Sequence, residues 1–183
     1  ESGSRAAVSH TGALIGSDDV FDAAVQRAGA VRVTTVNQLF AAAQTLASGT
    51  RVEGPRLAIL TNGGGPGVMA ADRASDLEVP LAELSAKTIE RLSEVLPQHW
   101  SHSDPVDILG DADSGRYQRA TELVLADPGV DGLLVLLTPQ AMTDPTACAE
   151  GVIKAAGKVR KPVLASWMGQ DLVNEGRRRF AEA

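Results

Sequence analysis

Apolar residues from Arg56 onward follow two alternating patterns, and together these patterns predict a parallel α/β fold. Short apolar runs predict strands at residues 57–61, 80–84, 106–109, 132–138 and 162–167. Between them, apolar residues spaced three or four apart predict helices at residues 67–76, 86–95, 115–126, 145–158 and 170–182. The runs at 133–137 and 163–165 are apolar on both faces, as expected of buried parallel strands. We therefore expect a doubly wound parallel sheet with helical crossovers.

Residues 1–50 follow a different pattern and are expected to form a separate unit. Ser17 has the residue type and position of an N-cap, and the periodic residues after it predict a helix. The segment 31–33 predicts a brief strand, and a capping box at 35–38 predicts a second helix. Residues 48–55 are rich in glycine, proline and polar side chains, which predicts a linker before the parallel sheet begins.

A glycine-rich loop joins the first predicted strand of the sheet to the next helix, and it predicts an anion site. Its candidate phosphate-binding residues are Asn62, Gly63, Gly64, Gly65 and Gly67. At a helix N-terminus, free backbone N–H groups and the positive end of the helix dipole face one point, so a phosphoryl group is the expected ligand. A tight turn alone would require only one or two of these glycines. Three other segments are expected at the same edge of the sheet, namely 107–113, 138–140 and 168–169.

The glycine loop also permits a dinucleotide-binding interpretation. Gly65 to Ala70 match the G-x-G-x-x-A pattern, and Glu83 lies near the end of the next predicted strand, where such folds bind a ribose. Pro66 removes one backbone donor, and few aromatic residues are present to stack a flavin, so this alternative is the weaker one. A P-loop is excluded because no G-K-[ST] sequence follows the glycines.

His10 is the candidate for nucleophilic catalysis. Its neighbours Ser9, Thr11 and Gly12 are small, supply hydroxyl and backbone donors for a phosphate, and leave the imidazole accessible to a bulky electrophile. A neutral imidazole is a good nucleophile near pH 7. The alternative is an exposed loop histidine without a chemical role.

No metal site is predicted. His99 and His102 have a spacing suitable for a metal, but no carboxylate or cysteine nearby completes a set of ligands. A second candidate comprises Asp111, Asp113 and Glu122, which match ligand positions of an EF-hand loop. We reject this match because Arg116 stands where that loop requires glycine.

Composition narrows the class of protein. Hydrophobic residues make up 44% of the 183 residues, which is sufficient for a core, and the net charge of −6 argues against nucleic acid and anionic membranes as partners. No apolar run approaches the roughly 20 residues of a membrane span. The single Cys148 excludes an internal disulfide and favours a reducing compartment, so a cytoplasmic location is expected.

Four segments, in this order, resemble the NDP-forming acyl-CoA synthetases, the superfamily of succinyl-CoA synthetase. They are residues 9–18, 61–67, 104–107 and 161–164, so the resemblance runs over essentially the whole chain. It implies a flavodoxin-like three-layer α/β/α fold with a parallel sheet. It also implies that residues 1–50 are the C-terminal part of a first ligase-CoA domain carrying the histidine loop, and residues 55–183 a second, succinyl-CoA synthetase-like domain.

The resemblance implies a phosphohistidine relay. An acid–CoA ligase of this family interconverts acyl-CoA, ADP and phosphate with carboxylic acid, CoA and ATP, and His10 matches the histidine that carries the phosphoryl group. The loop from Asn62 to Gly67 matches one of the helix N-termini that hold it. Coenzyme A and ATP or ADP are the expected cofactors of the full-length enzyme, and none is expected to bind stably to this fragment.

The resemblance also implies missing partners. A CoA-binding Rossmann domain and an ATP-grasp domain, on the same or a separate chain, would complete the enzyme, and a small carboxylic acid would be its substrate. We expect a fragment that is inactive alone and belongs to a homo- or hetero-oligomer. The alternative is a non-catalytic, acyl-CoA- or ligand-sensing region of a GNAT-type protein lysine acetyltransferase, although the presence of His10 favours chemistry.

Overall fold

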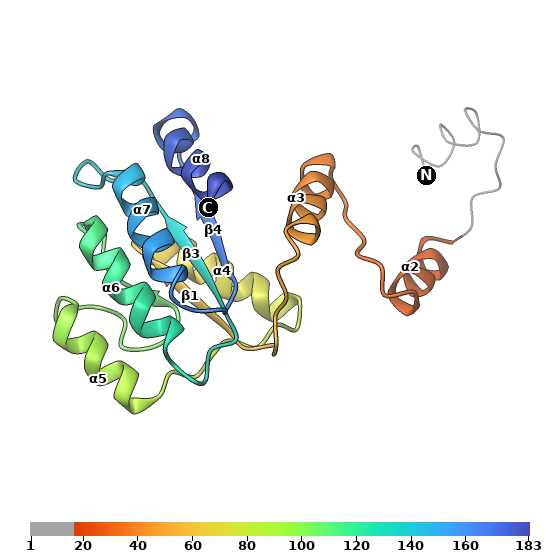
Figure 1. Cartoon of the computed structure of the whole chain (residues 1–183). Coiled ribbons are helices and arrows are strands. Elements are labelled where there is room, and N and C mark those ends of the chain that lie inside the picture. The colour runs from red at the N-terminus through yellow and green to blue at the C-terminus, as the bar shows by residue number, and fades with distance from the viewer. Residues whose placement is uncertain (1–16) are drawn as a thin grey trace. The chain divides into compact units, whose positions relative to one another are not determined.

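The computed structural model describes residues 17–183, which fall into two compact units divided between Thr50 and Arg51 (Figure 1). The first unit contains helices α2 (Asp18–Arg27) and α3 (Val36–Ala47). The second unit contains a parallel sheet and the remaining helices.

The helices of the first unit begin close to where the sequence predicts them. Thr35 and Gln38 form the expected capping box, because each side chain accepts a hydrogen bond from the other residue's backbone N–H group. Ser17 is the N-cap of α2, but its side chain makes no capping hydrogen bond. The brief strand predicted at 31–33 is wrong. No described strand of this unit lies beside it, and Arg32 instead binds Asp18 of α2 at 2.5 Å.

The sheet of the second unit has four parallel strands in the order β2-β1-β3-β4, which confirms the predicted sheet type. They are β1 (Leu57–Thr61), β2 (Val106–Asp107), β3 (Gly132–Leu137) and β4 (Val163–Trp167). Thr61 pairs with Asp107 on one side and with Leu136 on the other. The carboxyl ends of the three neighbouring strands therefore lie at the same level, so the loops that follow them share one edge.

The strand predicted at 80–84 is reduced to a single bridge between Leu81 and Leu57. Two hydrogen bonds join this segment to Leu57, after which the chain leaves β1. It leaves because Ser85, the N-cap of the next helix, binds the buried carboxylate of Asp127 through its N–H (2.8 Å) and its hydroxyl (2.9 Å). Strand β2 is also shorter than predicted. Leu109 adopts φ +70°, a left-handed conformation that a strand does not permit.

The helices of the second unit match the predicted ones, with small differences at their ends. They are α4 (Gly64–Asp76), α5 (Ala86–Val95), α6 (Ser114–Leu125), α7 (Pro145–Ala156) and α8 (Asn174–Glu182), with a short 3-10 helix η1 (Gln170–Val173) before α8. The helix predicted from residue 67 begins at Gly64, so the glycines form its first turn. No helix of the described residues is long and apolar enough to cross a bilayer.

These helices complete three layers. Helix α4 packs on β1 and β2, while α6 and α7 lie side by side on the other face, flanked by α5 and α8 (Figure 1). The core between the layers is aliphatic, with a few large aromatic side chains. Tyr117 and Trp167 are buried in it, and each donates a hydrogen bond to a backbone carbonyl, that of Leu136 (3.0 Å) and that of Pro145 (2.9 Å), respectively.

Just before β2 begins, the side chain of Asp104 accepts a hydrogen bond from β1 in place of a neighbouring strand. Its Oδ1 accepts a hydrogen bond from the N–H of Ile59 at 2.7 Å, whereas its Oδ2 is buried without a partner. Burial raises the pKa of this carboxyl to about 7, partly opposed by the Ile59 hydrogen bond. Because the folded-state pKa lies above the ordinary value, the stabilising contribution of Asp104 is complete at about pH 4 and is lost as pH rises towards 7.

We predict that Asp104→Asn stabilises the protein at pH 8 by about 2–4 kcal/mol, because the neutral amide keeps the acceptor for Ile59 without a buried charge. The gain should shrink towards zero near pH 4. Urea denaturation followed by circular dichroism from pH 4 to 8 measures it. Asp72→Asn, on the exposed face of α4, makes the same charge change without burial. An equal gain at pH 8 in both variants would contradict the assignment.

Candidate functional site

Two residues, Asn62 and Gly63, join strand β1 to α4, and this connection leaves two backbone donors free. The N–H of Gly63 donates to Thr61 Oγ1 (3.1 Å), and that hydroxyl donates to the Gly63 carbonyl (2.9 Å). The first helical hydrogen bond runs from the Gly67 N–H to the same carbonyl (3.2 Å). The N–H groups of Gly64 and Gly65 have no acceptor among residues 17–183. They form the positive end of a 13-residue helix at the carboxyl edge of the sheet.

Asn62 fixes the position of these donors. Its side chain is 1% exposed and makes two hydrogen bonds with the backbone of Thr138 after β3. The Asn62 Nδ2 donates to the Thr138 carbonyl at 2.9 Å, and the Thr138 N–H donates to Asn62 Oδ1 at 2.8 Å. The side chain thus holds the loop to β3, and a direct contact of Asn62 with a phosphoryl group stays a prediction.

The glycines of the loop serve different purposes. A Cβ atom at Gly67 would lie 2.9 Å from Thr61 Cγ2, so this glycine lets α4 pack closely on β1. A Cβ atom at Gly63 would lie 3.0 Å from Thr138 Oγ1, a buried hydroxyl without a hydrogen-bond partner in the described chain. A Cβ atom at Gly65 would meet nothing within 4 Å. Gly65 therefore faces open space, as the binding of an anion at the helix N-terminus requires.

An acidic side chain stands beside the first turn of α4. Asp107, the last residue of β2, accepts a hydrogen bond from the Leu109 N–H through Oδ1 (2.9 Å). Its Oδ2 would lie 3.2 Å from a Cβ atom at Gly64. The sequence places Asp107 at the ligand edge, but its spacing alone does not reveal that it borders the glycine loop. Strand pairing brings the two together.

Neither metal candidate forms a cluster. The carboxylates of the EF-hand match have separate partners: Asp111 binds Arg116 (2.5 Å), Asp113 caps α6, and Glu122 binds Lys158 (2.6 Å). No group of three potential metal-binding side chains occurs within residues 17–183.

The dinucleotide interpretation is not supported by the position of Glu83. The Glu83 carbonyl lies beside Gly129, which precedes β3, because a Cβ atom at Gly129 would be 2.7 Å from it. Glu83 is thus on the side of the sheet where the strands begin, while the glycine loop lies where they end. A ribose-binding acid must reach a ligand at the glycine loop, and Glu83 lies at the opposite edge.

The histidine segment lies outside the described residues. Ser9, His10, Thr11 and Gly12 precede residue 17, so the structure does not test whether they approach the glycine loop. Their assigned roles stay predictions.

Two family models match the chain. "Succinyl-CoA ligase like flavodoxin domain" matches residues 1–46, and "Ligase-CoA domain" matches residues 57–181. Acetate–CoA ligase [ADP-forming] I of Archaeoglobus fulgidus is 41% identical over 97% of the chain and 25% of its own length. The alpha subunit of acetate–CoA ligase [ADP-forming] II of Pyrococcus furiosus is 42% identical over 92% of the chain and 37% of its own length.

A solved structure is similar as well. The dinucleotide forming acetyl-coenzyme A synthetase 1 of Ca. Korarchaeum cryptofilum, in complex with phosphate and ADP, matches with a TM-score of 0.89 and 33% identity. The match covers 98% of the chain and 39% of that protein. The chain thus spans between a quarter and two fifths of these relatives. The match confirms the flavodoxin-like α/β fold.

The family follows from the extent of the model match. Because the ligase-CoA model covers more than half of the residues of this chain, the chain belongs to the ligase-CoA family of ADP-forming acyl-CoA synthetases.

Proposed function

We propose that the chain is the phosphoryl-carrying part of an ADP-forming acid–CoA ligase, which converts acyl-CoA, ADP and phosphate to carboxylic acid, CoA and ATP. His10 is transiently phosphorylated, and the N-terminus of α4 holds the phosphoryl group. The observation that carries this proposal is the pair of free N–H groups at Gly64 and Gly65, in a chain of this family. The synthetase of Ca. Korarchaeum cryptofilum, which was solved with phosphate and ADP, supports it.

The chemistry suits a neutral imidazole. A ring nitrogen of His10 attacks the phosphorus of an acyl phosphate, so that a P–N bond forms, the P–O bond breaks and the carboxylate leaves. The other ring nitrogen keeps its proton. The phosphoryl group then passes to ADP as the P–N bond breaks. Backbone donors and a helix dipole stabilise the added negative charge without a bulky side chain. No lysine stands in the loop to retain the group.

Asp107 favours release of the phosphoryl group from the N-terminus of α4. Its carboxylate borders the first turn of α4, so it opposes the negative charge that the free N–H groups attract. A site that holds a phosphoryl group only between two transfers benefits from such a balance, because very tight binding would slow the second transfer.

The domain organisation is part of the proposal. In α2 and α3 no residue is buried, and Phe21, Phe40 and Leu46 are between 59% and 70% exposed. Apolar helix faces of this kind normally cover a sheet. This supports residues 1–50 as the C-terminal part of a first ligase-CoA domain and 55–183 as the second.

The full enzyme would use coenzyme A and ATP or ADP, with a small carboxylic acid as substrate, in the cytoplasm. A CoA-binding Rossmann domain and an ATP-grasp domain would supply the remaining sites. The Pyrococcus furiosus relative is an alpha subunit, which supports an assembly of separate chains. The relatives named above are ligases and synthetases, and they give no support to the sensing region of an acetyltransferase.

We predict that the full-length protein acquires label from γ-labelled ATP and that His10→Ala reduces the label to background. His102→Ala is the matched control, because His102 is exposed and its ring bonds the Gln98 carbonyl at 3.1 Å. Acid-labile, base-stable radioactivity on a gel measures phosphohistidine. Equal labelling of the His10→Ala variant and the unmodified protein would contradict the assignment of His10 as the phosphorylated residue.

We predict that Gly65→Ala separates stability from phosphoryl retention. Alanine favours the helix by up to about 1 kcal/mol, so the melting temperature should stay or rise. Its methyl group would fill the open space before the donors, so the label should be lost roughly tenfold faster, the effect of one charge-assisted hydrogen bond.

Gly115→Ala, in the first turn of α6, is the matched control for this substitution. Its Cβ atom would lie 3.1 Å from the end of the flexible Arg119 side chain and 3.5 Å from Asp113 Oδ1, an ordinary contact distance. Its label should decay at the rate of the unmodified protein. Identical decay rates in both glycine variants would contradict a role for Gly65 in phosphoryl retention.

A further inference from the structure

A cavity of about 330 Å³ lies at the edge of the sheet where the strands begin. Its lining comes from the segments that enter β1, β3 and β4, and includes Arg51, Glu53, Arg160 and Lys161. Because the strands are parallel, this edge is opposite the glycine loop. The cavity is therefore separate from the proposed phosphoryl site.

The cavity collects positive charges that lack acidic partners. None of Arg51, Arg160 and Lys161 forms an ion pair with a carboxylate of residues 17–183. The Lys161 Nζ donates to the Asp127 carbonyl at 2.5 Å, which places the ammonium and leaves it further donors. The whole chain carries a net charge of −6, so the grouping of three positive side chains around one cavity is a local charge of the opposite sign.

The second acid at the cavity, Asp131, already has a paired cation in Arg56. Asp131 is held by Arg56, whose Nε and Nη2 donate to its two oxygens at 2.8 Å each. These hydrogen bonds, together with one from the Arg56 backbone, lower the pKa of Asp131 to about 2. Only Glu53 remains to balance the three cations, so the cavity carries an excess of two positive charges.

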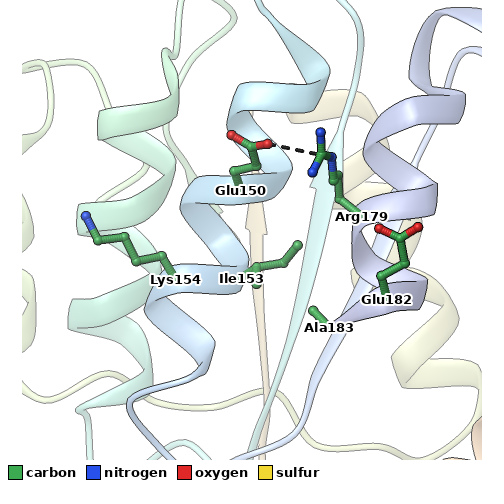
Figure 2. Close-up of a pocket in the computed structure, with 6 residues that line it drawn as sticks. All are labelled: Glu150, Ile153, Lys154, Arg179, Glu182 and Ala183. Carbon is green, nitrogen blue, oxygen red and sulfur yellow. Dashed lines mark ion pairs between the residues drawn. The ribbon is translucent and has the colours of Figure 1, made fainter.

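The groove between α7 and α8 offers a contrast (Figure 2). It has a similar volume, about 310 Å³, and also carries both cations and acids. There Arg179 lies 3.7 Å from Glu150 and 3.0 Å from Glu175, so its charge is already balanced. The cavity at the amino ends of the strands differs because Arg51 and Arg160 form no ion pair with a carboxylate of residues 17–183.

We propose that the cavity at the amino ends of the strands binds a small phosphate monoester, such as a mononucleotide. The two excess positive charges match a phosphate monoester dianion, and arginine suits phosphate oxygens because its donors form a planar fork. Val130, Val159 and Pro162 give the cavity an apolar part against which a sugar or base can pack. A volume near the lower limit of ligand pockets suits a ligand of about the size of one nucleotide.

Binding there has a mechanical consequence. Arg51 and Glu53 belong to the segment that joins the two compact units, and Arg160 and Lys161 directly precede β4. A phosphate held by both segments fixes the joining segment against the sheet. The site lies at the opposite edge of the sheet from the glycine loop, so binding there orders the connection instead of joining the chemistry.

The test is a titration of the full chain with AMP. Calorimetry measures the affinity, and the NMR resonances of the backbone amides of residues 159–161 report where AMP binds. AMP is expected to bind and to shift these resonances, whereas adenosine, which lacks the phosphate, is expected not to bind. Raising the salt concentration should weaken AMP binding. The double variant Arg51→Ala, Arg160→Ala should weaken it at least about tenfold, as expected for lost hydrogen bonds to a charged group.

The double variant Arg91→Ala, Arg119→Ala is the matched control. Both arginines are exposed on α5 and α6 and have no ion pair in the described part of the chain, so the change in net charge is the same. It should bind AMP as the unmodified chain does. Equal melting temperatures of the two double variants show that neither is unfolded. AMP should also slow cleavage by trypsin after Arg51 in the unmodified chain.

Four results would overturn the proposal: no AMP binding at millimolar concentration, equal binding of adenosine and AMP, undiminished binding in the Arg51, Arg160 variant, or shifts confined to Gly64 and Gly65. The last result would place the ligand at the glycine loop instead. The proposal is independent of the phosphohistidine chemistry, because loss of labelling in the His10→Ala variant has no bearing on AMP binding at this edge.

Discussion

The pair of hydrogen bonds between the Asn62 side chain and the Thr138 backbone determines where the candidate site lies. It takes the place of strand pairing just beyond the ends of β1 and β3, so the chain can turn into α4 within two residues. Loss of this amide would leave the partly buried N–H and carbonyl of Thr138 without these partners, which is costly. The two free donors at Gly64 and Gly65 keep their place at the sheet edge because the buried Asn62 side chain has both of these hydrogen bonds satisfied.

Small residues allow a ligand to approach the backbone at the first turn of α4 closely. Gly67 brings α4 within van der Waals contact of Thr61, and Gly65 keeps the space before the helix open. Backbone donors of this kind are fixed by the fold, so they need no rearrangement when charge develops. The nearby Asp107 carboxylate opposes that attraction. The result is an arrangement suited to a group that must be held briefly and then passed on.

The two edges of the sheet present different kinds of positive charge. At the carboxyl edge, charge comes from peptide dipoles at a helix N-terminus, which contact a ligand without long side chains. At the amino edge it comes from arginine and lysine side chains around a cavity with an apolar part. The first suits a phosphoryl group carried on a protein side chain. The second suits a freely exchanging ligand with a phosphate and a carbon skeleton.

Features that depend on neighbouring residues were predictable from the sequence. The helices, the parallel strands β1, β3 and β4, the capping box at Thr35 and the glycine loop all follow from local periodicity, turn chemistry and short motifs. The order of those motifs also identified the family, since it requires no knowledge of contacts. The wrong predictions were short segments, at 31–33 and 80–84, where a strand exists only if a partner accepts its hydrogen bonds.

Tertiary structure alone decided which distant residues meet. Asn62 and Thr138 are 76 positions apart, and Asp104 lies 45 positions from Ile59. The placement of Glu83 at the wrong edge for a ribose, and the gathering of Arg51 with Arg160 around one cavity, likewise follow from strand order and register. Local spacing does not encode these properties. They arise when the whole sheet buries its apolar faces, because the pairing that satisfies the most backbone groups then fixes every loop at its edge.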